Sequence, residues 1–197
     1  MSHGSHPSHP HSSVHGYHHR KRSAAMSPSL TFIKRATGPA QASEKATGVP
    51  ASVTIAQAIL ESGWGQHHIG EANNYFGVKA QKHADGSITF GSNASGYVEV
   101  PTHEYVGGKK VTVQAPFRKY AGMTGSFKDH AEFLRNNSRY SKALAAYAAD
   151  GDAAAFAHGL QKAGYATDPH YAKLLIGIMK SHNLYQYDAP RPDAGKK

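Results

Sequence analysis

Residues 53–66 read VTIAQAILESGWGQ, and this stretch decides the fold. On a wheel of 100° per residue its side chains separate into an apolar arc and a polar arc, as in an amphipathic helix. Gly63 and Gly65 then stop the helix, so Glu61 falls in its last turn. The apolar arc holds Val53, Ile55, Ala56, Ile59 and Leu60, and the polar arc holds Thr54, Gln57 and Glu61.

The position of Glu61 is typical of a catalytic acid. A carboxyl group in the last turn lies near the negative end of the helix dipole, and Trp64 follows three residues later. Both features raise the pKa of the carboxyl group. A glycosidase needs a glutamic acid that is still protonated near neutral pH, because this acid protonates the leaving oxygen. By spacing alone, the competing interpretation is a solvated surface glutamate.

A change to strand-like segments follows between residues 87 and 120. Gly107 and Gly108 supply a hairpin turn, so we expect a small antiparallel sheet. Pro101 cannot donate a ladder hydrogen bond and predicts a bulge or an edge, which leaves the facing of Glu104 open by one register step. The segments are SITF (87–90), GYVEVPTHEYV (96–106) and KVTVQAPFRKY (110–120).

The rest of the chain is predicted to be helical. Asp152 and Asp168 are expected as N-caps, with Pro169 at the first position of the last helix. The fold class is therefore α+β and mainly α, with a helical lobe, a small β lobe and a ligand site at their junction. The expected helices are 124–136, 141–149, 153–163 and 169–183.

Composition divides the 197 residues into one domain and two tails. Residues 1–25 hold seven of the fifteen histidines with many serines and prolines, and they are expected to be a disordered basic tail. Residues 26–47 are expected to be a linker and the start of the first helix. The domain is placed at 48–187, and 188–197 is expected to be a disordered tail.

Charge and cysteine content exclude several classes of partner. The net charge of +9 favours a polyanionic partner, but the basic residues outside the tail are scattered, which argues against nucleic acid. No apolar stretch is long enough to insert in a membrane or to serve as a secretory signal. The chain has no cysteine, and His67 and His68 lack a third ligand at a telling distance, so no metal and no cofactor are expected.

Four blocks of sequence resemble the glucosaminidase domains of glycoside hydrolase family 73. AQAILESGWGQ (56–66) is followed by NNYFGVKA (73–80), and THEYVGGKKVTVQAPFRKY (102–120) is similar to the β lobe of the family. AGYATDPHYA (163–172) is similar to the signature of the last helix, which also occurs in flagellar rod-associated hydrolases. The blocks occur in the expected order and together span residues 48 to about 185.

The resemblance implies a lysozyme-like, two-lobed peptidoglycan hydrolase. Such an enzyme cleaves the β-1,4 bond between N-acetylglucosamine and N-acetylmuramic acid. Glu61 matches the essential acid of the family, and Glu104 matches a β-lobe carboxylate that activates water or steadies positive charge, with Glu99 as its nearest rival. Tyr165 matches a cleft tyrosine that orients the acetamido group of the substrate or the attacking water.

Aromatic residues near these blocks are candidates for sugar binding, because aromatic faces stack on sugar rings. Asn74, Tyr75 and Phe76 are expected to line a subsite, although Phe76 is equally suited to the core. Trp64 is a further candidate, and packing beneath the acid is the competing interpretation. We expect a monomer that binds the glycan strands of peptidoglycan.

Mechanism and biological role stay open at this point. Carboxylates about 5 Å apart indicate a retaining mechanism and about 6.5–9.5 Å an inverting one, and a third route uses the N-acetyl oxygen of the substrate as nucleophile. A lytic transglycosylase or muramidase, and a wall-binding module without activity, are the alternative functions. We expect action on the bacterial cell wall, as a phage lysin, an autolysin or a secreted effector, with export by a holin or a dedicated system.

Overall fold

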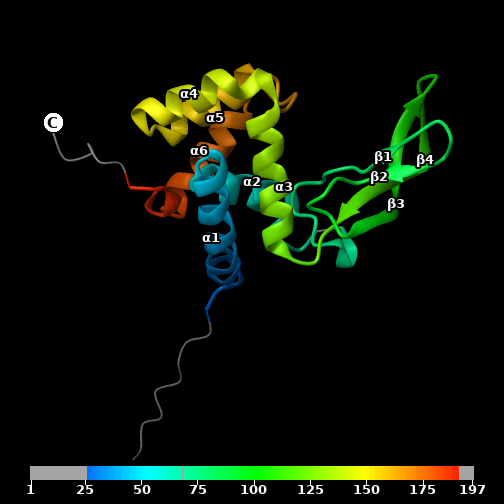
Figure 1. Cartoon of the computed structure of the whole chain (residues 1–197), viewed down its shortest axis with the longest axis horizontal. Helices are drawn as coiled ribbons and strands as arrows, with labels where there is room; N and C mark the ends of the chain where they lie inside the picture. The colour runs from blue at the N-terminus through cyan, green and yellow to red at the C-terminus, as the bar shows by residue number, and fades with distance from the viewer. Residues whose placement is uncertain (1–25, 68, 191–197) are drawn as a thin grey trace, which may run out of the picture.

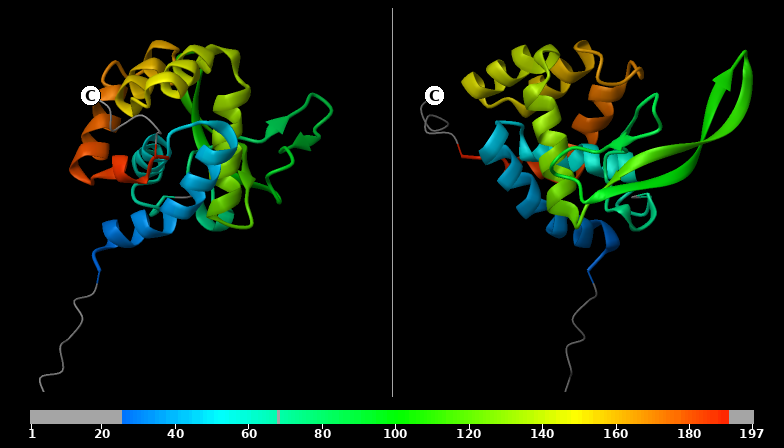
Figure 2. Two further views of the ribbon diagram at one scale, coloured as in Figure 1. Left: turned by 60° about the vertical axis from the view of Figure 1, so that its left-hand side comes forward. Right: turned by 45° about the vertical axis from the view of Figure 1, so that its right-hand side comes forward.

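Helix α2 (Ala51–Ser62) runs through the middle of a helical lobe, from which a long β hairpin projects (Figures 1 and 2). The computed structural model describes residues 26–67 and 69–190. The other helices are α1 (Pro28–Thr47), α3 (Met123–Asn136), α4 (Ser141–Asp150), α5 (Ala153–Lys162) and α6 (Tyr171–Ser181), with short 3-10 turns η1 (Gly70–Ala72), η2 (Ser138–Tyr140) and η3 (Leu184–Tyr187). The strands are β1 (Gln81–Lys82), β2 (Ile88–Thr89), β3 (Gly96–Val106) and β4 (Lys109–Lys119).

The surroundings of α2 differ from those of a surface amphipathic helix. Every residue from Ala51 to Ile59 is buried, because α1, α5, α6 and η3 all pack against this helix. Thr54 and Gln57 of the polar arc are therefore buried too, and their side chains find partners inside the protein. Thr54 Oγ1 donates a hydrogen bond to the carbonyl of Pro50 (3.1 Å), and the Gln57 amide bonds two side chains of the site described below.

Helix α1 fills nearly all of residues 26–47, where we expected a linker and the start of the first helix. It is 20 residues long, its N-cap Ser27 accepts a hydrogen bond from the amide of Leu30 (3.2 Å), and it ends at Gly48, whose φ is 78°. The sequence did not predict a helix of this length because Gly38 and Pro39, which have low helix propensity, lie within it. Its tertiary contacts with α2 and α3 stabilise it, since they bury one apolar side. The buried apolar residues are Phe32, Ile33, Ala36 and Ala40.

The segment after residue 187 is also more ordered than a tail. The Asp188 carboxylate accepts hydrogen bonds from the amide (2.7 Å) and the hydroxyl (2.8 Å) of Ser52, so it caps α2 from a distant part of the chain. The amide of Ala189 donates to the Glu44 carboxylate (3.1 Å). Residues 188–190, the start of the expected tail at 188–197, therefore pack on the domain. The rest of that tail and the expected tail at 1–25 lie outside the described residues.

The hairpin has the predicted turn and an unbroken register. β3 and β4 pair antiparallel from Gly96 opposite Lys119 to Val106 opposite Lys109, and the two turn glycines both have positive φ. Pro101 pairs with Gln114 without a bulge, because each strand of a hairpin has a free edge where the missing N–H costs nothing. The expected strand 87–90 is reduced to β2, which pairs with β1.

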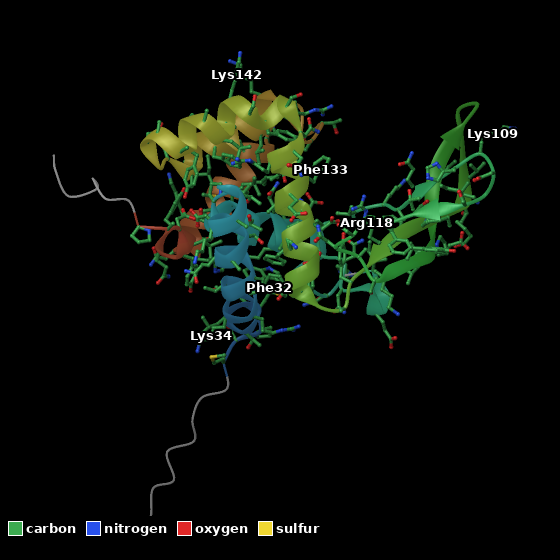
Figure 3. The ribbon with its side chains drawn as sticks, viewed as in Figure 1. Phe32, Lys34, Lys109, Arg118, Phe133 and Lys142 are labelled. Carbon is green, nitrogen blue, oxygen red and sulfur yellow. The ribbon has the colours of Figure 1, made fainter. Side chains whose placement is uncertain are left out.

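A cluster of polar side chains fastens the base of the hairpin to α3. Asp129 of α3 accepts two hydrogen bonds from Arg118 Nη1 (3.0 and 2.9 Å), one from the Tyr120 hydroxyl (2.6 Å) and one from Asn93 (3.3 Å). Figure 3 labels Arg118 where the hairpin meets the helical lobe. This buried node fixes how the β lobe stands beside the helices.

Two predicted N-caps have different outcomes. The Asp152 carboxylate accepts a hydrogen bond from the amide of Ala155 (2.9 Å), so the prediction for α5 is confirmed. Helix α6 begins two residues later than predicted, and Asp168 forms a turn before it by accepting from the amide of His170 (2.7 Å). In the described ranges, no helix is both long and apolar enough to cross a membrane.

Candidate active site

A cavity of about 590 Å³ opens at the end of α2. Its walls come from α2, α3, the segment after η1 and the loop that precedes α6, so chain segments more than 100 residues apart meet there. The lining residues are Glu61, Phe76, Val78, His130, Phe133, Arg139, Tyr140, Tyr165, Ala166 and Thr167. Glu61 is the only carboxylate among these described residues.

Glu61 occupies the penultimate position of α2, as the sequence predicts. Gly63 ends the helix with a φ of 53°, which turns the chain away directly after the acid. The residue reaches solvent in the cavity, but the surrounding protein still partly desolvates its carboxyl group. Burial raises the pKa of Glu61, and a hydrogen bond from Tyr171 opposes this effect by stabilising the carboxylate.

Tyr171, the first residue of α6, also belongs to the site. Its hydroxyl is hydrogen-bonded to Glu61 and accepts a hydrogen bond from Gln57 Nε2 (3.0 Å). The Oε1 atom of Gln57 in turn accepts a hydrogen bond from His130 Nε2 (2.9 Å). Burial lowers the pKa of His130 to about 3, so this histidine is neutral at physiological pH. A chain of hydrogen bonds between uncharged side chains therefore holds the Glu61 carboxyl group in place.

One feature of the sequence indicates this network. Gln57 precedes Glu61 by four residues, and residues at this spacing lie on the same face of a helix. A glutamine on that face can bond a group that also bonds the acid. The partners, Tyr171 and His130, come from α6 and α3, and no local pattern connects them with α2.

Tyr165 lines the same cavity as Glu61, in agreement with its expected place. Its ring lies 5.3 Å from the ring of Tyr171 and 6.0 Å from that of His130. Burial raises the pKa of Tyr165 well above its usual range, and the nearby Tyr171 and Glu61 add to this effect. The phenol therefore keeps its proton, which it donates to the Tyr171 hydroxyl and can redirect to a ligand in the cavity.

Only one of the three residues expected in a sugar subsite lines the cavity. Phe76 does so, and its ring stacks on His130 at 3.9 Å with 5° between the planes. Tyr75 is 2% exposed and packs against Phe32 and Phe127 in the core, so its predicted contact with substrate is not supported.

Asn74 is the third of these residues, and its side chain is already occupied. Its Nδ2 donates to the carbonyls of Val78 (2.8 Å) and Arg118 (2.9 Å), and its Oδ1 accepts from the amide of Val78 (3.0 Å). Asn74 therefore clamps a loop against β4 instead of facing the cavity. The polar side chain made Asn74 a candidate for sugar binding, but these hydrogen bonds are all made to backbone atoms.

Trp64 lies away from the cavity lining. Its ring packs edge-on against Phe32 (6.2 Å) and against His182 (4.8 Å). These contacts give no support to the sugar-binding assignment of Trp64, which stays a prediction. Burial raises the pKa of Glu61, and the contribution of Trp64 to this burial stays a prediction.

The β-lobe carboxylates are placed by their backbone alone. Glu104 pairs with Val111, and its side chain lies outside the described part of the structure. Glu99 pairs with Pro116 and is exposed. The choice between a retaining and an inverting mechanism depends on the distance between the Glu61 and Glu104 carboxylates. The mechanism therefore stays a prediction.

Two residues of the cavity rim were not anticipated from the sequence. Phe133 of α3 is 50% exposed, which is unusual for a large apolar ring, and Arg139 of η2 is exposed beside it on the rim. Figure 3 shows Phe133 on the side of α3 near the top of the helical lobe. An exposed ring at the rim of a cavity is suited to stacking on a sugar.

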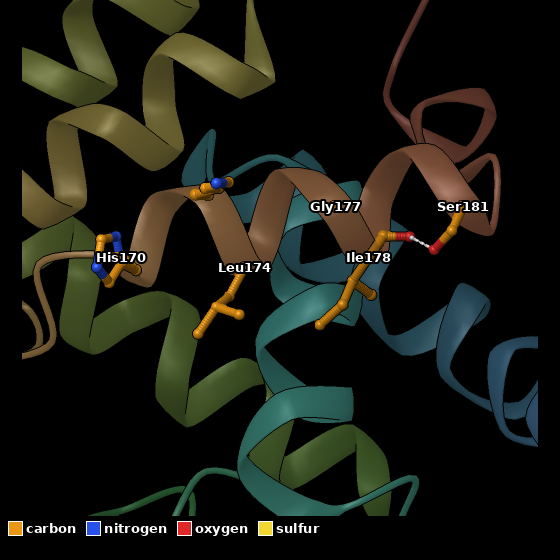
Figure 4. Close-up of a pocket in the computed structure, with 6 residues that line it drawn as sticks. His170, Leu174, Gly177, Ile178 and Ser181 are labelled. Carbon is orange, nitrogen blue, oxygen red and sulfur yellow. Dashed lines mark hydrogen bonds between the residues drawn. The ribbon is translucent and has the colours of Figure 1, made fainter.

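A second hollow, of about 560 Å³, lies along the outer face of α6 (Figure 4). His170, Leu174 and Ile178 are among its described lining residues, and none of these is a carboxylate. It therefore lacks a group comparable to Glu61. Within residues 26–67 and 69–190, no cluster of three or more histidine, aspartate or glutamate side chains could hold a metal ion, and of the pair His67–His68 only His67 is described.

The helical lobe, the projecting hairpin and a partly desolvated glutamic acid at the end of a central helix define a lysozyme-like glycoside hydrolase. The chain belongs to the glucosaminidase family. The model of this family, described as mannosyl-glycoprotein endo-beta-N-acetylglucosaminidase, matches residues 38–184.

Individual relatives agree with this assignment. The chain is 38% identical over 157 residues to the peptidoglycan hydrolase FlgJ of Escherichia coli K12, covering 77% of this chain and 46% of FlgJ. It is 36% identical over 174 residues to the exo-glucosaminidase LytG of Bacillus subtilis, covering 87% of this chain and 58% of LytG. The chain thus spans about half the length of these curated relatives.

A solved structure supports the same fold. The catalytic domain of the autolysin Auto from Listeria monocytogenes superposes with a TM-score of 0.69 at 33% identity, covering 84% of this chain and 90% of that domain. This likeness confirms the predicted fold class, a mainly helical lysozyme-like domain with a small antiparallel β lobe.

Proposed function

We propose that this protein is an endo-β-N-acetylglucosaminidase of peptidoglycan, which hydrolyses the β-1,4 bond between N-acetylglucosamine and N-acetylmuramic acid. The observation that carries the proposal is the environment of Glu61. Its carboxyl group faces a cavity lined with aromatic rings, and burial raises its pKa. The relatives include proteins named peptidoglycan hydrolase and exo-glucosaminidase, which supports a glycan of the cell wall as the substrate.

Glu61 acts as general acid in this proposal. Its proton passes to the glycosidic oxygen as the bond from that oxygen to C1 of N-acetylglucosamine breaks. Water then adds its hydroxyl group to C1 and returns its proton to the Glu61 carboxylate. The Tyr171 hydroxyl stabilises this carboxylate while it carries the negative charge, because a hydrogen bond to a charged acceptor is stronger than one to a neutral acceptor.

The cavity favours assistance by the acetamido group of the substrate. The protonated Tyr165 phenol lines the cavity together with Glu61. A phenol can hold the acetamido group in place while its carbonyl oxygen attacks C1, and water later opens the cyclic intermediate. The alternative is inversion by a water that Glu104 activates.

Digestion of purified peptidoglycan followed by mass spectrometry tests the proposed cut. New reducing ends on N-acetylglucosamine, with the mass of one water added per cut, are the expected products. Reducing ends on N-acetylmuramic acid would show a muramidase, and anhydromuramic ends would show a lytic transglycosylase. Binding to the wall without any new ends would show a binding module.

An exo-acting enzyme is the second candidate, because the relative LytG is named exo-glucosaminidase. The chain length of the glycan separates the two. An endo-acting enzyme shortens the mean chain length early, whereas an exo-acting one releases single sugars while the long chains persist. We further propose that the protein acts as a monomer, which its elution volume in size-exclusion chromatography tests. We also propose that it acts on the wall outside the cytoplasm, which fractionation of cells tests.

A further inference from the structure

A cationic groove lies between α4 and α5, beside the catalytic cavity. Its volume is about 350 Å³, and Arg139, Lys142 and Lys162 stand around it. All three residues are exposed. Small side chains form its floor, among them Ala143 and Gly159. We refer to it as the α4–α5 groove.

Close packing of the two helices produces this floor. A Cβ atom placed on Gly159 would lie 2.7 Å from the Cβ atom of Ala143, so only glycine allows this approach. The helices meet backbone to backbone at this point, and the alanine methyl groups leave a shallow apolar surface between the charged side chains. The groove is therefore a consequence of the fold and not of a flexible surface loop.

Basic and acidic residues lie at opposite ends of the pair formed by α4 and α5. Helices α4 and α5 are joined by a short turn and run antiparallel, which brings Lys142 at the start of α4 to the same end as Lys162 at the end of α5. The acids Asp150 and Asp152 stand at the other end, by the turn. Among the residues that the structure describes, no carboxylate lines the groove.

The three cations are also without a salt bridge in the described residues. The ion pairs found there are Arg118–Asp129 and Lys128–Glu132, both on other elements. Arg139 lies over the ring of Tyr140, 5.9 Å from the ring centre, which leaves its charge available. Like charges that gather without counter-charges attract an anionic ligand.

Arg139 connects the groove with the catalytic cavity, because it lines both. A ligand held at Glu61 that carries a branch can extend past Arg139 into the groove. We propose that the α4–α5 groove binds the peptide stem of peptidoglycan through its carboxylates. This inference rests on the proposed function, since the stem is attached to the N-acetylmuramic acid next to the bond that Glu61 cleaves.

The chemistry of the stem fits the groove in two respects. Its free carboxylates match the three cations, and its alanine methyl groups match the apolar floor of alanines and glycine. A phosphate polymer of the wall would match the cations alone. Arg139 lines both the catalytic cavity and the α4–α5 groove. This continuity also favours a ligand that is covalently joined to the glycan over a separate polymer.

A titration without any catalysis tests the binding directly. The probe is a synthetic stem tetrapeptide with free carboxylates, added to ¹⁵N-labelled full-length protein, with its carboxyl-amidated analogue as matched ligand. Amide shifts are expected at the start of α4 and the end of α5, and Lys142→Gln/Lys162→Gln should weaken binding by about five- to tenfold, as expected for exposed ion pairs. Lys34→Gln/Lys180→Gln removes the same charge elsewhere and should bind like wild type; Figure 3 shows Lys34 far from Lys142.

Several results of this titration would overturn the proposal. Shifts confined to other elements, equal binding of the amidated peptide, or an equal loss in both double variants would each show that the groove does not recognise the stem. Shifts with a polyphosphate of the teichoic acid type, but none with the tetrapeptide, would assign the groove to a different wall polymer.

Hydrolysis then tests the role of the groove in catalysis. Wild type should cleave peptide-bearing glycan several-fold faster, in kcat/KM, than glycan stripped by an amidase. Lys142→Gln/Lys162→Gln should lose this preference and keep the wild-type rate on stripped glycan. An unchanged preference would refute the proposal. If wild type cleaved neither glycan while the titration gave the expected shifts, the proposed function would fail and the groove would still be established as a peptide site.

Discussion

Replacement of Glu61 by glutamine is the sharpest test of the site. Glutamine keeps the shape of the side chain and its hydrogen bond with Tyr171, but it has no proton to transfer. Loss of a general acid costs about 10²- to 10⁴-fold in rate. At about 1.36 kcal/mol per factor of ten, this corresponds to about 2.7–5.4 kcal/mol of transition-state stabilisation. Release of reducing ends from purified peptidoglycan is the assay.

Thermal unfolding of the same variant separates catalysis from folding. Burial raises the pKa of Glu61 in the folded state, so ionisation of this residue disfavours folding as the pH rises from the ordinary pKa to the raised one. Glutamine lacks this penalty, and the variant should be at least as stable as wild type at pH 7. The gain stays below about 1 kcal/mol because the residue is exposed in the cavity. Below the ordinary pKa the gain should vanish.

Glu71→Gln is a matched control, since Glu71 is exposed and does not line the cavity. It should keep full activity. Activity of Glu61→Gln within tenfold of wild type would refute the assignment of Glu61 as the acid. A fall of several degrees in its Tm would show that Glu61 has a structural role instead.

Three further predictions concern the surroundings of the acid. Tyr171→Phe removes the hydrogen bond that lowers the pKa of Glu61, so the basic limb of the kcat/KM profile should move to higher pH; an unmoved limb would exclude Glu61 as the titrating group. Asp129→Ala leaves its cationic and phenolic partners unsatisfied and should lower the free energy of unfolding by about 3–5 kcal/mol, as measured by urea titration. A loss below about 1 kcal/mol would contradict this prediction. Tyr165→Phe should impair hydrolysis more than Glu104→Gln, with retained configuration by NMR; inverted product with an inactive Glu104→Gln would show that this carboxylate positions the water.

The features that the sequence determined by itself are local ones. The period of the apolar residues and the two glycines after Ser62 place the end of α2, and with it Glu61, correctly. The paired glycines at the hairpin turn, both with positive φ, and the Asp152 cap depend on a few neighbouring residues, so local chemistry is sufficient. The four sequence blocks and their order were sufficient to indicate the family.

Tertiary structure decided which of these residues meet. Asn74 and Phe76 are two residues apart, yet one clamps the backbone and the other lines the cavity, because burial depends on contacts with β4 and α3. Helix α1 forms in spite of Gly38 and Pro39, since its apolar side packs on α2 and α3. In a helix interior glycine costs about 1 kcal/mol and proline about 3 kcal/mol relative to alanine, and such packing outweighs these costs.

The properties of the acid itself also arise only in the folded chain. Gln57, His130 and Tyr171 lie on three different helices, and their hydrogen bonds form only when those helices pack together. Desolvation raises the pKa of Glu61 because distant segments close around the end of α2. The sequence could therefore place the carboxyl group on its helix, but its protonation and its partners are set by residues far away in the chain.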